Sequence, residues 1–136
     1  MLTELLVVVL IIGILAAIAV PSFLGHTGKA VDTQAKALAR TAQMAAETIA
    51  TEHSGLYERV SQNELNKVEP SVRIAGSTTD AYVSAASGGQ TTYALTATAT
   101  NGDEFTVTKN AAGEVTRTCA SPLLKTGCSG GASGSW

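Results

Sequence analysis

Few residues in this chain have the types and spacing that chemistry requires. Two cysteines, Cys119 and Cys128, stand with eight residues between them, and two adjacent acids, Asp103 and Glu104, precede them. No Ser/His/Asp set, nucleophile motif or phosphate-cradling glycine loop occurs in the sequence. We therefore expect no enzymatic activity, which leaves binding and structural roles.

The possible metal ligands are sparse and support no metal or cofactor site. Two cysteines would form a disulfide in an exported chain, but would be thiols or half of a metal site in the cytosol. His26 and His53 are too far apart along the chain to share an ion, and we expect both to be solvated. Asp103 and Glu104 could help to bind calcium, yet calcium takes roughly six to eight oxygen ligands. The tail offers few beyond backbone and hydroxyl groups.

The composition divides the chain into two unequal parts. It has 136 residues, 45% apolar and 15% charged, with a net charge of −2. Residues 1–24 carry one charge, Glu4, whereas residues 25–136 carry nine basic and ten acidic side chains. The chain is not basic enough for a dedicated nucleic-acid binder and not polar enough for a disordered tail. We expect one small domain joined to an apolar segment.

The apolar segment, here called the apolar arm, runs from Leu5 to Leu24 without a charge. As a helix its twenty residues would span roughly 30 Å, the thickness of a bilayer's hydrocarbon core. A cleavable signal peptide would begin with basic residues, but the first charged residue here is an acid, Glu4. A plain membrane anchor explains the length and the apolarity. It does not explain Glu4, because a charge at a membrane span is costly and usually functional.

Two residues weaken the arm as a helix. Gly13 lies in its middle, and Pro21 lies near its end, where it lacks an N–H group and crowds the carbonyl of Ala17. Taken singly, each is common in membrane helices. Together with Glu4 they form a more specific pattern.

The segment ELLVVVLIIGILAAIAVP, from Glu4 to Pro21, closely resembles the N-terminal signature of type IV pilins and type II secretion pseudopilins. In that family a prepilin peptidase removes a short leader, and the new first residue, usually phenylalanine, is N-methylated. The family's glutamate is the fifth mature residue, whereas Glu4 is the fourth, so we expect one residue before Met1, which is then no initiator. Met1 and Thr3 also depart from the family pattern.

The resemblance implies a structural role and a pathway. The leading prediction is a subunit of an extracellular type IV pilus, a homopolymer assembled by pilus machinery from a pool in the inner membrane. Glu4 would neutralise the N-terminal ammonium of an adjacent subunit, and Gly13 to Pro21 would lose its helix in the filament. An exported chain of this kind would pair Cys119 with Cys128, as many type IV pilins do.

Two alternatives remain open at the level of sequence. One is a major pseudopilin of a type II secretion system, which the disulfide and the few acids disfavour. The other is a membrane-anchored binding domain that acts as a monomer. We expect no direct nucleic-acid binding, because Lys29, Lys36 and Arg40 lie on a helix that the rest of the domain should largely cover.

The remaining sequence predicts a helix packed on a sheet, an α+β fold. One helix is expected from about residue 1 to 53, with a packing stripe at helical spacing and a stop at Ser54-Gly55. This divides the chain into a hydrophobic helix at 1–24, an amphipathic helix at 25–55, a connecting loop at 56–80 and a sheet region at 81–136. The stripe comprises Val31, Ala35, Leu38, Ala42, Ala45 and Ile49.

A short helix and four strands complete the prediction. Ser61 and Glu64 have capping-box spacing, which indicates a helix at 62–67. Alternating apolar residues predict an antiparallel meander with strands at 81–86, 92–100, 104–109 and 114–119, and Asn101-Gly102 is typical of a hairpin turn. Residues 130–134 are expected to be a flexible tail. For Trp136 we expect disorder in preference to docking on a neighbouring molecule.

Overall fold

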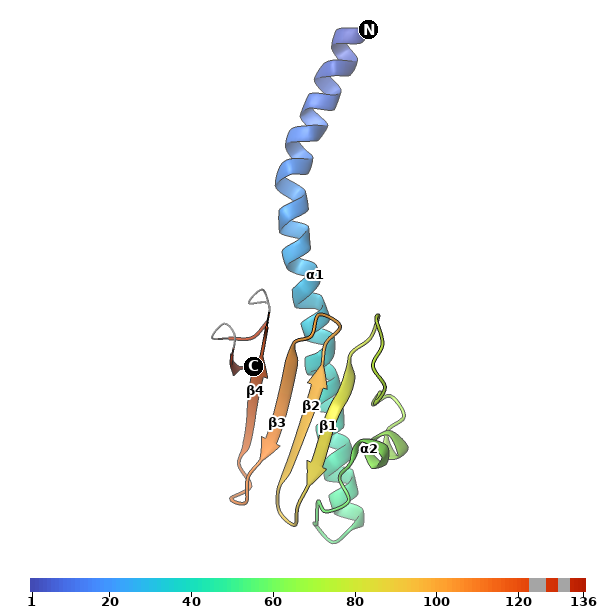
Figure 1. Ribbon diagram of the computed structural model, residues 1–136, viewed down its shortest axis with the longest axis vertical. Helices are drawn as coiled ribbons and strands as arrows, with labels where there is room; N and C mark the ends of the chain where they lie inside the picture. The colour runs from blue at the N-terminus through green and yellow to red at the C-terminus, as the bar shows by residue number, and fades with distance from the viewer. Residues whose placement is uncertain (123–126, 130–132) are drawn as a thin grey trace.

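The computed structural model describes residues 1–122, 127–129 and 133–136. A long helix protrudes from a small head, where its second half lies against an antiparallel sheet (Figure 1). This confirms the α+β class. The elements in chain order are α1 (Leu2–Glu52), α2 (Gln62–Val68), β1 (Tyr82–Gly88), β2 (Tyr93–Thr98), β3 (Glu104–Lys109), β4 (Val115–Ala120) and β5 (Ser133–Ser135).

Helix α1 ends where its sequence predicts. Ser54 and Gly55 both adopt left-handed backbone angles, with φ of 59° and 85°, and the Gly55 N–H donates to the Ala50 carbonyl at 2.7 Å. This left-handed pair turns the chain away from the helix axis. The second helix, α2, begins with the expected cap, because the Ser61 side chain accepts a hydrogen bond from the Glu64 N–H.

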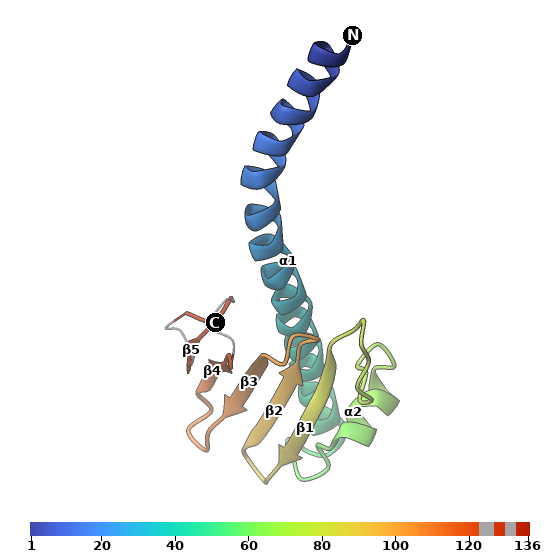
Figure 2. The ribbon, with the colours of Figure 1, turned by 45° about the horizontal axis from the view of Figure 1, so that its top comes forward.

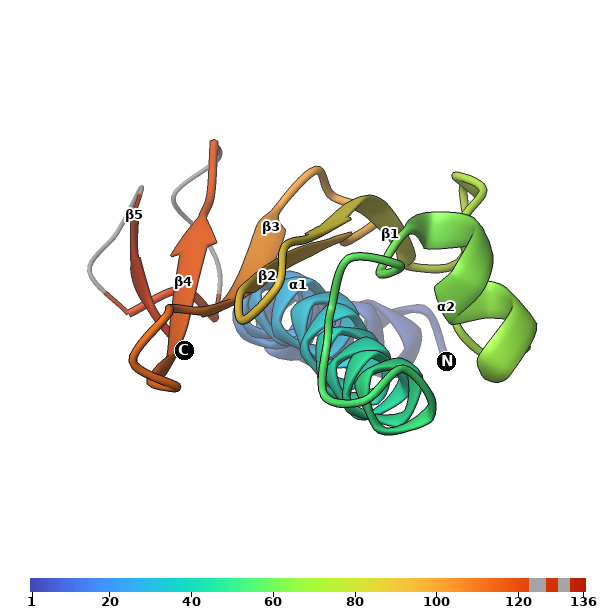
Figure 3. The same cartoon turned by 90° about the horizontal axis from the view of Figure 1, so that it is seen from below.

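The sheet has five strands in the order β1-β2-β3-β4-β5, each antiparallel to its neighbour. The observed strands match the four predicted ones to within two residues. Between β2 and β3 the turn places Gly102 at a φ of +90°, and the Ala99 N–H donates to the Asp103 carbonyl. Seen from below, α1 lies beneath the sheet and α2 lies beside β1 (Figure 3).

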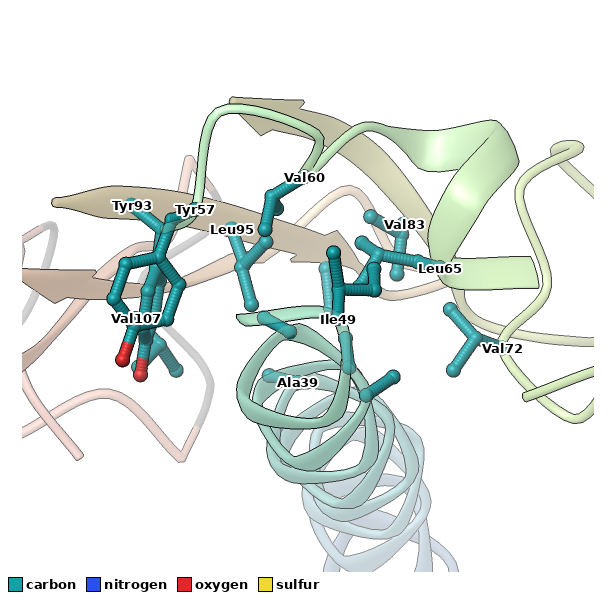
Figure 4. Close-up of a cluster of buried hydrophobic side chains, with 14 of the residues drawn as sticks. Ala39, Ile49, Tyr57, Val60, Leu65, Val72, Val83, Tyr93, Leu95 and Val107 are labelled. Atoms are coloured by element: carbon teal, nitrogen blue, oxygen red, sulfur yellow. The ribbon is translucent and has the colours of Figure 1, made fainter. Parts of the chain in front are cut away.

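The core lies between one face of the sheet and the alanine-rich face of α1. Small side chains such as Ala42 and Ala46 let the helix approach closely, and larger residues such as Ile49, Leu95 and Val107 fill the remaining space (Figure 4). Most of the predicted stripe is buried. Val31 and Leu38 are only partly buried, and the buried helix residues also include Asp32, Ala39, Ala46 and Ala50.

The predictions for the end of the chain were wrong where the structure describes it. Residues 133 and 134, expected to belong to a flexible tail, lie in β5, which pairs with Thr118 to Ala120 of β4. The rest of that predicted tail, residues 130–132, lies outside the described residues. Trp136 packs edge-on against Phe105 in its own head, with ring centroids 5.8 Å apart, and its Nε1 donates to the Thr118 carbonyl at 2.9 Å.

Candidate functional site

The apolar arm has no partner among the described residues of the head. Among its large apolar side chains even the least exposed, Ile11, keeps 49% of its surface accessible. The arm is the N-terminal part of α1, which extends beyond the head as a gently curved helix (Figures 1 and 2). By length and composition α1 could cross a membrane, and none of its most apolar 18-residue window is buried.

Glu4 lies near the tip of the protruding helix, far from the head. Its side chain is 81% exposed, and its Oε2 lies 3.6 Å from the Met1 amino nitrogen, the only ion pair it makes among the described residues. Gly13 and Pro21 lie further along the same rod, which stays helical through both. At about 1.5 Å per residue, Glu4 and Pro21 are roughly 25 Å apart. The three residues therefore form a linear surface rather than a pocket.

The predicted disulfide is present in the head. Cys119, near the end of β4, is bonded to Cys128, and their Cα atoms are 5.7 Å apart. Both cysteines are buried beside Phe105 and Ala35. The bridge therefore holds residues 127–129, the described part of the C-terminal loop, against α1 and the sheet.

A polar contact that the sequence did not reveal holds the same loop. Asp32 Oδ2 on α1 accepts a hydrogen bond from the Gly127 N–H at 2.7 Å. One helical turn later, Lys36 Nζ donates to the Gly127 carbonyl at 2.6 Å. We call this pair of contacts the loop clasp. Their spacing of four residues along a helix allows a local pair between Asp32 and Lys36, but it says nothing of a partner 95 residues away.

A third side chain, Asn101, joins the loop clasp from the β2–β3 turn. Its Nδ2 donates to Asp32 Oδ1 at 2.8 Å and to Asp103 Oδ2 at 3.2 Å. Its Oδ1 accepts from the Asp103 N–H at 3.0 Å. Asp32 and Asp103 are both almost completely buried, with 1% and 0% of their surface accessible. The neutral amide of Asn101 thus lies between two buried carboxylates.

The acidic pair that suggested calcium does not act as a pair. Asp103 is buried inside the head, whereas Glu104 is exposed. Across the described part of the chain, no group of three or more His, Cys, Asp or Glu residues is placed to hold a metal ion. His26 is exposed and His53 is half-buried, and they lie at separate points along α1 and its end.

A second polar cluster lies at the far end of the sheet, around Glu47. Burial opposes ionisation of this carboxyl, but hydrogen bonds from Tyr57, Lys109 and Tyr93 outweigh it and hold its pKa below the usual value. The Tyr57 hydroxyl donates to Glu47 at 2.6 Å and accepts from Lys109. The tyrosine rings lie side by side, 5.1 Å between centroids (Figure 4). Burial, then the Glu47 charge, raises the pKa of Tyr93 to about 12.

This cluster is structural in character, because its charges are satisfied within the head. The pKa of Lys109 is raised by its hydrogen bond to Tyr57, and burial only partly opposes this; its bond and ion pair with Glu47 raise it further. The Lys109 Nζ to Glu47 Oε1 distance is 3.2 Å. The cluster ties the last turns of α1 to β2, β3 and the loop after α1.

The chain was compared with protein-family models, curated proteins and solved structures, and nothing matched in any of the three searches. The features that bear on function are therefore the exposed, charge-free arm, the Glu4 carboxylate that precedes it and the head that carries both.

Proposed function

We propose that this chain is a structural subunit of an extracellular type IV pilus, assembled through its N-terminal helix. One observation carries the proposal. A folded head with its own core presents a charge-free apolar helix of twenty residues that stays exposed in the part of the chain that the structure describes. The resemblance of residues Glu4 to Pro21 to the pilin signature supports the same assignment.

The arm requires an apolar environment for energetic reasons. Its thirteen Leu, Ile and Val residues would each gain about 1.5–3 kcal/mol on leaving water, so exposure in water would cost on the order of tens of kcal/mol. Lipid supplies one such environment before assembly. A bundle of identical arms supplies the other, in which close packing replaces contacts with lipid.

The shape of the molecule favours an open assembly. The arm projects from one end of the head (Figure 1). In the proposed filament a neighbour's arm packs beside it at a different height along the axis, and such a head-to-tail contact propagates as a helical filament when its rotation does not close into a ring. The same surface of every subunit is then buried, which removes the exposed apolar area.

Glu4 determines the register in this proposal. In a water-free bundle its carboxylate pairs with the N-terminal ammonium of an adjacent subunit. A buried charge without its partner costs several kcal/mol, so misplaced subunits are rejected. In the isolated chain the Glu4 side chain is exposed and makes no ion pair with any described residue of the head, which leaves it available for this role.

The segment from Gly13 to Pro21 is the part of the arm that we expect to lose its helix on assembly. It is helical in the isolated chain. Proline removes one backbone hydrogen bond there, and an alanine-rich stretch adds little side-chain packing. In the filament, carbonyls released by unwinding would need partners from neighbouring arms or local turns.

The disulfide fits an exported chain, since such bonds persist in oxidising compartments.

Replacement of Glu4 tests the proposal directly. Glu4→Gln keeps the side chain's shape and removes its charge, and Glu58→Gln makes the same change at an exposed position of the head. We expect Glu4→Gln cells to lose filaments in sheared surface material while retaining the membrane pool. Glu58→Gln cells should keep both. Cryo-electron microscopy and N-terminal mass measurement of the sheared material provide the readout.

Three outcomes would contradict the proposal. Unchanged filaments with Glu4→Gln would remove Glu4 from assembly. Surface display of the wild-type chain only as a monomer would favour an anchored binding domain. A short filament confined to the periplasm would favour a pseudopilin.

A further inference from the structure

The turn between β2 and β3 contains the chain's only Asn-Gly pair, Asn101-Gly102. The other three asparagines, Asn63, Asn66 and Asn110, precede larger residues. In an Asn-Gly pair the glycine backbone nitrogen attacks the asparagine side-chain carbon Cγ with least steric hindrance. Ammonia leaves and a cyclic imide forms. Water then opens the ring at either carbonyl and leaves aspartate or isoaspartate.

The folded head holds Asn101 in a geometry that opposes this reaction. Three hydrogen bonds fix its side-chain amide, two donated to Asp32 and Asp103 and one accepted from the Asp103 N–H. The attacking group is held as well, because the Gly102 N–H donates to the Ala99 carbonyl at 3.0 Å. Ring closure therefore requires the turn to open and these bonds to break.

Conversion of Asn101 would disrupt the site that holds the C-terminal loop. Its Nδ2 is the donor that separates the carboxylates of Asp32 and Asp103, both almost fully buried. Deamidation replaces that donor with a third carboxylate at about 3 Å from the other two. Like charges at this distance repel strongly where water is excluded. Asp32 also holds the Gly127 N–H, so the repulsion reaches the loop clasp.

We propose that Asn101 is a deamidation site that the folded head protects, and that its deamidation releases the loop clasp. A chain that remains unfolded converts Asn101 and then cannot rebuild the contact between α1, the β2–β3 turn and residue 127. A chain that folds promptly keeps the amide. The deamidated fraction at Asn101 therefore increases irreversibly with the time that the head spends unfolded.

The rate in the wild-type chain is the first test. The full chain in non-ionic detergent is incubated at mildly alkaline pH, either oxidised and folded or reduced and in urea. Peptide mass mapping then measures deamidation at Asn101, with Asn63, Asn66 and Asn110 as internal controls. In urea we expect Asn101 to be the first asparagine that deamidates. In the folded chain we expect its deamidation to be about 100-fold slower, because two or three hydrogen bonds must break before the ring can close. Equal rates in the two states would overturn the proposal.

The consequence for the loop clasp is tested with variants. Asn110 is the matched control, because it makes a similar turn contact with Glu114 but is exposed. We expect Asn101→Asp to lower the urea midpoint and speed proteolysis near residue 127, Asn101→Ala to do so less, and Asn110→Asp to leave both near wild type. An Asn101→Asp chain as stable as wild type would overturn the claim. If that variant does not fold, partially deamidated wild-type protein is refolded instead, and the refolded fraction must exclude converted chains.

Discussion

Replacing Asp32 with alanine is the sharpest perturbation of the head's architecture. The substitution lies on α1 and removes the carboxylate that receives the Gly127 N–H at 2.7 Å and the Asn101 Nδ2 at 2.8 Å. Alanine keeps the helix, since it is the best helix former. Any loss of stability therefore reports the tertiary contacts of one buried side chain.

The magnitude follows from the number and kind of bonds. Hydrogen bonds to a charged group contribute about 1.5–3 kcal/mol each, so two of them set a gross loss of about 3–6 kcal/mol. Part of this is recovered, because the variant no longer buries a carboxylate that is 1% exposed. We expect a net loss of about 3 kcal/mol. That is a large part of the roughly 5–15 kcal/mol that stabilises a typical domain.

Trp136 provides the assay. It is the chain's only tryptophan, and it packs against Phe105 in the head, so its fluorescence reports unfolding of the head alone. Far-ultraviolet circular dichroism would be less informative, because the arm stays helical in detergent micelles. The free energy of unfolding is measured by urea titration of the oxidised full-length chain in non-ionic detergent.

Two variants define the interpretation. Glu52→Ala removes an exposed acid from the same helix and should change the free energy of unfolding by no more than about 0.5 kcal/mol. Asp32→Asn keeps the shape but turns an NH₂ group toward one of the two donors, so we expect a loss close to that of Asp32→Ala. An Asp32→Ala loss below about 1 kcal/mol would contradict the role assigned to Asp32, because unsatisfied buried donors cost at least that much.

Two further predictions concern the opposite end of the head. The folded pKa of Glu47 is lowered from 4.5 and that of Lys109 is raised from 10.5, so their contribution is complete between these values. This stabilising contribution is lost as pH falls through the Glu47 pKa or rises through the Lys109 pKa. In a plot of the urea midpoint against pH, Lys109→Met should make the decline at alkaline pH less steep. An unchanged decline would contradict this prediction. Gly88→Ala should cost about 2–3 kcal/mol, because its Cβ would stand 1.8 Å from the Tyr57 carbonyl oxygen. Gly25→Ala, with open space around its Cβ, is the control and should cost nothing.

Elements with strong local signals were predictable from the sequence. The alternating residues at 104–109 coincide with β3, and Ser61 caps α2 as its spacing indicates. By contrast β5 was missed, because Ser-Gly-Ser has no strand pattern of its own. Its three residues are extended because they pair with Thr118 to Ala120, and that edge exists only after β4 has formed.

Some features of the candidate site were likewise predictable from the sequence, and others were not. The positions of Glu4, Gly13 and Pro21 along one helix follow from the 1.5 Å rise alone, so no tertiary contact was needed to place them. The two cysteines had only each other as disulfide partners. The role of Asn101 had no local signal beyond the turn, since its partner Asp32 lies 69 residues earlier.

The sequence by itself determined the apolar arm, the helix that contains it and the strands of the sheet. These elements follow from the apolar character and the helical or alternating spacing of residues that are close together in the chain. Only the tertiary structure decided that Asp32 is buried, that Lys36 holds the Gly127 carbonyl and that Trp136 docks on Phe105. These contacts join residues far apart in the chain. A polar side chain acquires such a partner only when packing has removed water and brought the two groups within hydrogen-bond distance.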